Sequence, residues 1–150
     1  MEREKLEKSL KDAGIKFFWV EKEELFQKIK DVVDEKRVFV SPTLKIDLGT
    51  YSPVQEAEVG IFEAMALCES TGTMLVEGEE LASLVPPISL AILMEKNIRK
   101  DLSDIIDIIK ENPEKPFAFI TGPSRTADIE KQVVIPAHGP KELILLIVKI

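Results

Sequence analysis

Residues 88–94, Ile-Ser-Leu-Ala-Ile-Leu-Met, decide the fold that this sequence predicts. Only Ser89 interrupts the apolar run, and the preceding Pro86-Pro87 pair is suited to ending a helix and setting the entry to a strand. An apolar run without polar alternation is typical of a strand whose two faces are both covered, as in a parallel sheet. We therefore expect residues 88–94 to form a central strand.

Helical and strand patterns alternate on both sides of this run. The clearest helix is predicted at residues 101–111, with Asp101 or Ser103 at its start and Asn112-Pro113 at its end. Further helices are expected at 3–12, 25–34 and 79–85. Strands are expected at 15–20, 37–40, 58–62, 65–68, 74–76, 117–121, 133–135 and 143–148. This order predicts an α/β domain with a mainly parallel sheet and helices on both faces.

Length and composition fit one globular domain. The chain has 150 residues, of which 45% are hydrophobic and 31% charged, and we expect residues 1–150 to form a single domain that begins with a charged helix at 1–14. The charge of −7 argues against a nucleic-acid binder. No apolar run reaches the roughly 20 residues of a membrane span, and residues 1–5 do not resemble a secretory signal. These features predict a cytoplasmic protein, and abundant Lys and Glu with sparse Asn and Gln lean towards a thermophile.

Cysteine and histidine usage limits the metal chemistry. Cys68 is the only cysteine, so this chain alone cannot hold an iron–sulfur cluster or form an internal disulfide. His138 is the only histidine, which leaves mainly carboxylates for any metal site. We expect no metal and no cofactor in this chain, and any electron-carrying metal in a partner.

The segment after the 117–121 strand carries one candidate site. Gly122 allows close backbone approach, Ser124 and Thr126 supply hydroxyls, Arg125 a guanidinium and Asp128 a carboxylate. Backbone N–H groups and hydroxyls can hold a phosphate or carboxylate, which Arg125 can bind through two charge-assisted hydrogen bonds. Alternatively, Ser124 or Asp128 caps a short helix and Arg125 pairs with a neighbouring carboxylate.

Two other places could contribute polar chemistry. His138, before Gly139-Pro140, could act as an acid, a base or a donor to an anion, or it could be a turn residue. Residues 69–73, Glu-Ser-Thr-Gly-Thr, lie between two predicted strands. There Glu69 could be a nucleophile or base and the hydroxyls could bind an anion, or Gly72 could simply provide an unusual φ. Ligands of open α/β sheets bind beyond the carboxyl ends of the strands, so we expect these loops to lie at the carboxyl ends of the strands.

The sequence resembles the lactate utilization protein C family, the LUD domain. The resemblance lies in residues 120–130, Ile-Thr-Gly-Pro-Ser-Arg-Thr-Ala-Asp-Ile-Glu, and residues 138–143, His-Gly-Pro-Lys-Glu-Leu. Thr-Gly-Thr at 71–73 and Leu-Val-Pro-Pro at 84–87 stand upstream in the expected order. The similarity extends loosely from about Val38 to the C-terminus.

The resemblance implies a fold like that of ribose 5-phosphate isomerase and the coenzyme A transferases. It also implies a part in oxidising L-lactate to pyruvate alongside iron–sulfur partner proteins. The positions that match the motif one by one, and so become expected site residues, are Ser124, Arg125, Thr126, Asp128 and His138. We expect Arg125 and the hydroxyls to hold a small anion, with Gly122, Thr71, Gly72 and Thr73 as further binding residues.

The chain departs from the family pattern in two respects. Ser70 stands where members commonly place an acidic residue, and Glu69 lies one position earlier, which in a strand faces the opposite side. The chain is also shorter at its N-terminus than typical members. Glu69 and His138 are the candidate catalytic residues, but a non-catalytic anion-binding or assembly subunit, or an isomerase or acyl-transferring enzyme, fits the same sequence. Self-association is left open.

Overall fold

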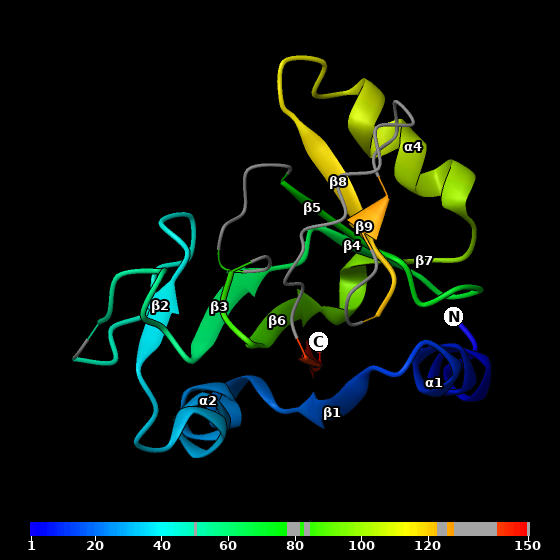
Figure 1. Ribbon diagram of the computed structural model, residues 1–150. Coiled ribbons are helices and arrows are strands. Elements are labelled where there is room, and N and C mark those ends of the chain that lie inside the picture. The colour runs from blue at the N-terminus through cyan, green and yellow to red at the C-terminus, as the bar shows by residue number, and fades with distance from the viewer. Residues whose placement is uncertain (50, 78–81, 83–84, 123–125, 128–140, 150) are drawn as a thin grey trace.

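The computed structural model describes residues 1–49, 51–77, 82, 85–122, 126–127 and 141–149. Within these residues the strands form two five-stranded sheets (Figure 1). The predicted strand at 133–135 and most of the predicted helix at 79–85 lie outside the described residues.

The first sheet is parallel throughout and confirms the prediction of a mainly parallel sheet. Its strands, in spatial order, are β1 (Lys16–Val20), β10 (Glu142–Val148), β6 (Ile88–Met94), β3 (Val59–Glu63) and β2 (Val38–Val40). The run that decided the prediction, β6, is the middle strand. Its side chains alternate between two cores, with Leu90 and Ile92 on one face and Ala91 and Leu93 on the other.

Helix α2 (Leu25–Val33) covers one face of this sheet. A short 3-10 helix, η1 (Lys22–Glu24), leads into it. The buried residues Ile29 and Val33 pack against Leu90 and other side chains of the first sheet, because apolar residues at helical spacing place both on one side of α2. This helix carries the chain from β1, at one edge of the first sheet, to β2 at the opposite edge.

The second sheet is mostly antiparallel. Its strands, in spatial order, are β7 (Ile98–Arg99), β4 (Ala66–Cys68), β5 (Met74–Glu77), β8 (Phe117–Ile120) and β9 (Thr126–Ala127). Only β4 and β7 run parallel, whereas β4, β5, β8 and β9 pair antiparallel in turn. Short turns cannot provide the crossover that a parallel pair needs, so the chain after β4 returns antiparallel as β5. The sequence analysis predicted β4, β5 and β8 as strands but did not predict that they form a separate sheet.

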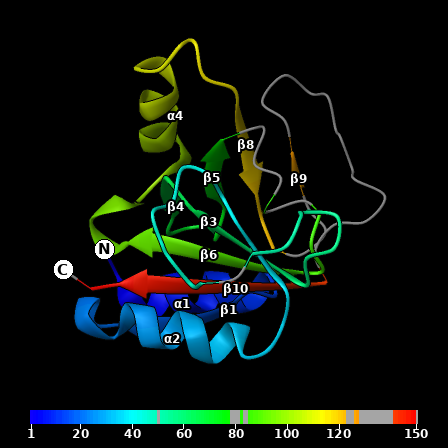
Figure 2. The same ribbon diagram turned by 90° about the vertical axis from the view of Figure 1, so that its left-hand side faces the viewer.

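The two sheets face each other across the main core. Helix α1 (Arg3–Asp12) contributes Leu6 and Leu10, both fully buried, next to Met74 of the second sheet and Leu145 of the first. The other face of the second sheet is covered by α4 (Leu102–Lys110), which follows η2 (Glu95–Asn97) and buries Ile105. Figure 2 shows β6 and β10 side by side and pointing the same way, with α2 below them and α4 at the top. The face opposite α2 is therefore covered by the second sheet together with α1, rather than by helices alone.

The described part of the chain contains no helix long and apolar enough to cross a membrane.

Candidate functional site

Two of the predicted site segments meet in space. The turn between β4 and β5 carries residues 69–73, and residues 121–122 follow β8; we call these two segments the site loops. Thr71 Oγ1 donates to Thr73 Oγ1 at 2.8 Å, and Thr73 Oγ1 lies 2.8 Å from Thr121 Oγ1. The three hydroxyls thus form a chain that links the site loops. Two of the three O–H groups are used within this chain, so it can offer one O–H to a ligand.

Strand pairing explains why these loops come together. Met74 of β5 lies opposite Ile120 of β8 in an antiparallel pair, so the residues immediately beyond them, Thr73 and Thr121, are also neighbours. Thr71 and Thr73 were predicted as binding residues, but Thr121 was not. Its place between the end of a strand and Gly122 is the sequence signal that could have identified it.

Both glycines of the site loops adopt left-handed backbone conformations. Gly72 has a φ of 74° and Gly122 a φ of 82°, values that residues with a Cβ rarely adopt. Hydrogen bonds from the amide of Cys68 to the carbonyl of Thr73 and from the amide of Gly72 to the carbonyl of Cys68 close the first loop. The predicted unusual φ of Gly72 is therefore confirmed, and Gly122 shares it.

These two glycines allow helix α1 to approach the site loops closely. A Cβ added to Gly122 would lie 2.1 Å from the carbonyl oxygen of Ala13, and one added to Gly72 would lie 3.1 Å from that of Ser9. The end of α1 therefore fills the space that a side chain would need. Because carbonyl oxygens repel anions, we expect a bound anion on the side of the site loops that faces away from α1.

One of the two site loops, at residues 121–122, does not lie where it was predicted. Gly122 contacts Ala13, just before β1 begins at Lys16, and the Lys16 ammonium pairs with Glu142 at the start of β10. Gly122 therefore lies near the amino ends of the first sheet, and for Gly122 the expectation of a place beyond the carboxyl ends is wrong. The amide of Glu69, by contrast, bonds to the carbonyl of Arg99, which follows the carboxyl end of β6. The rule about carboxyl ends applies to strands of the parallel sheet, whereas β8 belongs to the second sheet.

Glu69 is buried and in contact with α1. Only 3% of its surface is exposed, its amide donates to the carbonyl of Arg99, and its Oε1 accepts a hydrogen bond from the amide of Glu2. Glu2 is the residue that precedes α1, so the carboxylate lies at the positive end of the helix. Ser70 stands directly before Thr-Gly-Thr, where the family pattern has an acidic residue. Its hydroxyl lies 3.2 Å from the buried sulfur of Cys68.

Four predicted site residues lie outside the described residues: Ser124, Arg125, Asp128 and His138. The backbone of Thr126 is described in β9, where it pairs with Ile120. Where the described chain resumes, at residue 141, the amide of Lys141 donates to the carbonyl of Pro87, just before β6. The roles assigned to the four residues stay predictions.

Electrostatic contacts fasten α1 to β1. The indole N–H of Trp19 donates to Glu7 at 2.8 Å, and the guanidinium of Arg3 lies 4.2 Å from the centre of the Trp19 ring. The hydrogen bond from Trp19 holds the pKa of the Glu7 carboxyl below its ordinary value of 4.5, and Arg3 and the charge of Lys11 act in the same direction, while burial opposes them. Ionised Glu7 is therefore part of the folded structure.

This pKa shift predicts a stability change at acid pH. Since the folded pKa is the lower one, the contribution of Glu7 is fully present above the unfolded value near 4.5 and is lost as the pH falls through the folded pKa. We expect Glu7→Gln to lower the thermal midpoint at pH 7 and to have a diminishing effect below pH 4.5. Melting curves of both proteins between neutral and acid pH measure this, and a midpoint difference that stays constant with pH would contradict it.

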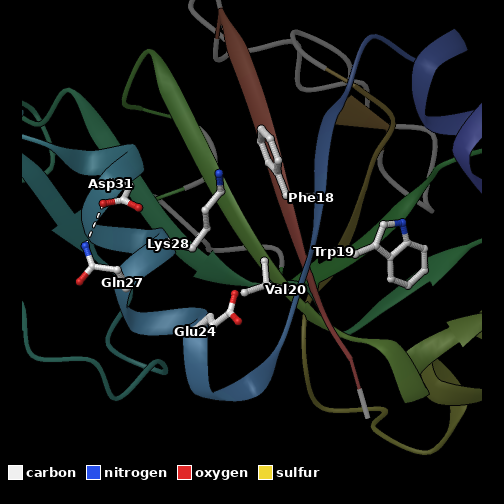
Figure 3. A pocket seen from close by; sticks show the side chains of 7 residues that line it. All are labelled: Phe18, Trp19, Val20, Glu24, Gln27, Lys28 and Asp31. Carbon is white, nitrogen blue, oxygen red and sulfur yellow. Dashed lines mark hydrogen bonds between the residues drawn. The ribbon is translucent and has the colours of Figure 1, made fainter.

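A separate depression lies between β1 and α2, away from the site loops. Its volume is about 460 Å³, and its lining includes Phe18 and Val20 of β1 and Lys28 of α2. Figure 3 shows Phe18 and Trp19 on opposite sides of β1. The Lys28 ammonium lies 3.9 Å from the centre of the Phe18 ring, so a cation–π contact already occupies part of this surface.

No group of three or more His, Cys, Asp or Glu side chains in the described part of the chain is placed to hold a metal ion.

Comparison with known proteins gives the site loops a family context. Residues 49–148 match the sequence model of the LUD domain, and this range contains both site loops and the motif at 120–130. The chain belongs to the LUD domain family. The resemblance drawn from the Gly-Pro-Ser-Arg-Thr-Ala-Asp and His-Gly-Pro motifs is thereby confirmed.

Named relatives of this LUD domain are longer proteins. It is 32% identical to lactate utilization protein C of Bacillus subtilis (strain 168), over 63% of this chain and 43% of that protein. It is also 32% identical to the uncharacterized protein YkgG of Escherichia coli (strain K12), over 65% of this chain and 47% of the relative. The chain thus spans less than half the length of these relatives.

A solved structure has the same fold. A DUF162 family protein from Deinococcus radiodurans superimposes with a TM-score of 0.77 over 97% of this chain and 95% of that chain. The two sequences are 17% identical, so the likeness extends to the fold.

Proposed function

We propose that this LUD domain takes part in lactate utilization by binding a small carboxylate, or a phosphate-bearing anion, at the site loops. The observation that carries the proposal is the hydroxyl chain of Thr71, Thr73 and Thr121, which lies beside Gly122 and so directly before Ser124-Arg125 in the family motif. The O–H that the chain leaves free, the hydroxyls of Ser124 and Thr126 and the guanidinium of Arg125 together suit an anion with several acceptor oxygens.

The proposed roles follow the chemistry of each side chain. Arg125 binds the anion through two hydrogen bonds, and the hydroxyls of Ser124 and Thr126 contribute further donors. His138 acts as an acid, a base or a hydrogen-bond donor to the same anion. A catalytic role for Glu69 would require its carboxylate to leave the amide of Glu2.

The oxidation of lactate needs an electron acceptor. With Cys68 as its single cysteine, this chain cannot supply the thiolates of an iron–sulfur cluster. We therefore assign binding of the organic acid to this domain and electron transfer to iron–sulfur partner subunits. The name of the Bacillus subtilis relative, lactate utilization protein C, supports a part in lactate utilization.

A thermal-shift screen tests the proposed ligand class. A ligand present at 100 times its Kd stabilises the folded state by about 2.7 kcal/mol, which raises the midpoint of a domain this size by roughly 5–10 °C. We expect L-lactate or a related small carboxylate to give such a shift, with sodium chloride at equal ionic strength as the control. A shift with sugar phosphates or coenzyme A derivatives alone would favour an isomerase or acyl-transfer role. A flat response to all of them would contradict anion binding.

A further inference from the structure

Glu69 is placed to organise the site loops without touching a ligand. Its carboxylate is nearly fully buried and accepts the amide proton of Glu2, directly before α1. The first turn of a helix leaves several N–H groups without partners inside the helix, and no side chain of α1 itself caps this end. The carboxylate of Glu69 therefore supplies, from the β4–β5 turn, the capping contact that α1 lacks.

The rest of α1 connects this contact to the site. Leu6 and Leu10 hold the helix in the core between the two sheets. Farther along, the carbonyl of Ser9 faces Gly72 and that of Ala13 faces Gly122. One helix thus touches Glu69 at its start and both site-loop glycines at its end. A displacement of α1 therefore changes the backbone contacts that support both loops.

The hydroxyl chain is formed by residues next to the two glycines that α1 contacts. Thr71 and Thr73 flank Gly72, and Thr121 precedes Gly122. The distances of 2.8 Å along the chain depend on the relative placement of the two loops, which α1 contacts together. Helix α1 lies outside residues 49–148, the part that matches the LUD domain.

We propose that Glu69 is a positioning residue: it anchors the start of α1, and α1 in turn holds the two site loops in the arrangement that the anion site needs. The effect on ligand binding rests on the proposed function, whereas the effect on α1 and the loops does not. In this account the position of the acceptor oxygen matters, and the ability of Glu69 to exchange a proton does not.

Three substitutions separate these properties in the full chain. Glu69→Gln keeps an acceptor oxygen at the same reach, Glu69→Asp keeps the charge but shortens the reach, and Glu69→Ala removes both. Glu77→Ala is the matched control, because Glu77 lies on β5 in the same hairpin, and its side chain makes a 3.9 Å surface ion pair with Lys115.

Two readouts need no ligand. Trp19 is the only tryptophan and is bonded to Glu7 of α1, so acrylamide quenching of its fluorescence reports how α1 is seated. Hydrogen exchange of the Cys68 and Gly72 amides reports the closure of the first site loop. We expect Ala and Asp to increase the quenching and to speed this exchange about five- to tenfold, while Gln and the Glu77 control stay close to wild type.

Binding of L-lactate and of inorganic phosphate is the third readout, with weaker binding expected for Ala and Asp but not for Gln. Unchanged quenching and exchange in both Ala and Asp would overturn the proposal, as would a Gln protein as impaired as the Ala protein. If Ala does not fold, the contrast between Asp and Gln decides. Wild-type protein that binds neither anion contradicts the proposed function, while quenching and exchange still test the anchor.

Discussion

Replacing Gly122 by alanine is expected to destabilise the protein by about 3 kcal/mol and to lower its thermal midpoint by roughly 10 °C. Two costs combine. A Cβ at a φ of 82° costs about 1–2 kcal/mol, because the left-handed region is unfavourable for residues with a side chain. In addition, that Cβ would lie 2.1 Å from the carbonyl oxygen of Ala13, a backbone atom that moves only if the end of α1 moves.

Gly49→Ala is the matched control for this substitution. Gly49 has a similar φ of 85°, but a Cβ there would have no atom within 4 Å. The control protein should therefore show the backbone cost alone, and the difference between the two midpoints measures the contact with α1. Equal midpoints for both variants would contradict the close packing of α1 on the site loop, and with it the route by which Glu69 is proposed to act.

Arg125→Ala is expected to weaken anion binding by about 2–4 kcal/mol, or roughly 30- to 1000-fold in Kd. This range applies to a desolvated charge pair in which the guanidinium binds the anion through two hydrogen bonds. Isothermal titration with L-lactate, or with the ligand that the thermal-shift screen identifies, measures the change. The thermal midpoint without ligand serves to separate loss of binding from loss of folding.

Arg37→Ala provides the control for charge. Arg37 lies directly before β2, where its side chain bonds to the carbonyl of Glu56 and pairs with Glu58 at 3.5 Å. Its removal changes the net charge by the same amount and should leave the affinity unchanged. An Arg125→Ala protein that binds as tightly as wild type would remove Arg125 from the proposed site.

The first sheet and its helices were predictable because their signals are local. The apolar run of β6 indicated a strand covered on both faces, and three-to-four spacing indicated α2 and α4. Of the apolar residues expected on one face of α4, Ile105 is buried, whereas Leu102 and Ile106 are exposed. Helix α1 was predicted at residues 3–12, where the structure has it. These patterns depend on neighbours within a few residues in sequence.

The second sheet was not predictable in the same way. Its strands are two to four residues long, and their partners are chosen by packing between distant parts of the chain. The pairing of β5 with β8 spans more than 40 residues of sequence, and neither strand carries a pattern that specifies the other. Composition and spacing identified β4, β5 and β8, but neither β7 and β9 nor the sheet to which all five belong.

For the site loops, the sequence indicated residues that the structure brings together, but not where the loops lie. Thr71 and Thr73 were predicted to bind a ligand, and the structure brings them to the segment that precedes the Arg125 motif. The position of Gly122 near the amino ends of the first sheet was missed, because it follows from the membership of β8 in the second sheet. The contacts of Gly72, Gly122 and Glu69 with α1 were also missed, since a charged helix with a narrow apolar stripe gives no indication of what its ends touch.

An NMR titration of isotope-labelled protein with L-lactate tests the central claim most directly. The account predicts saturable shifts of the Gly72, Thr73, Thr121 and Gly122 amides, with the amides of α2 unchanged. Shifts confined to the depression between β1 and α2, or no saturable shift at the site loops with lactate or inorganic phosphate, would contradict the assignment of an anion site to these loops.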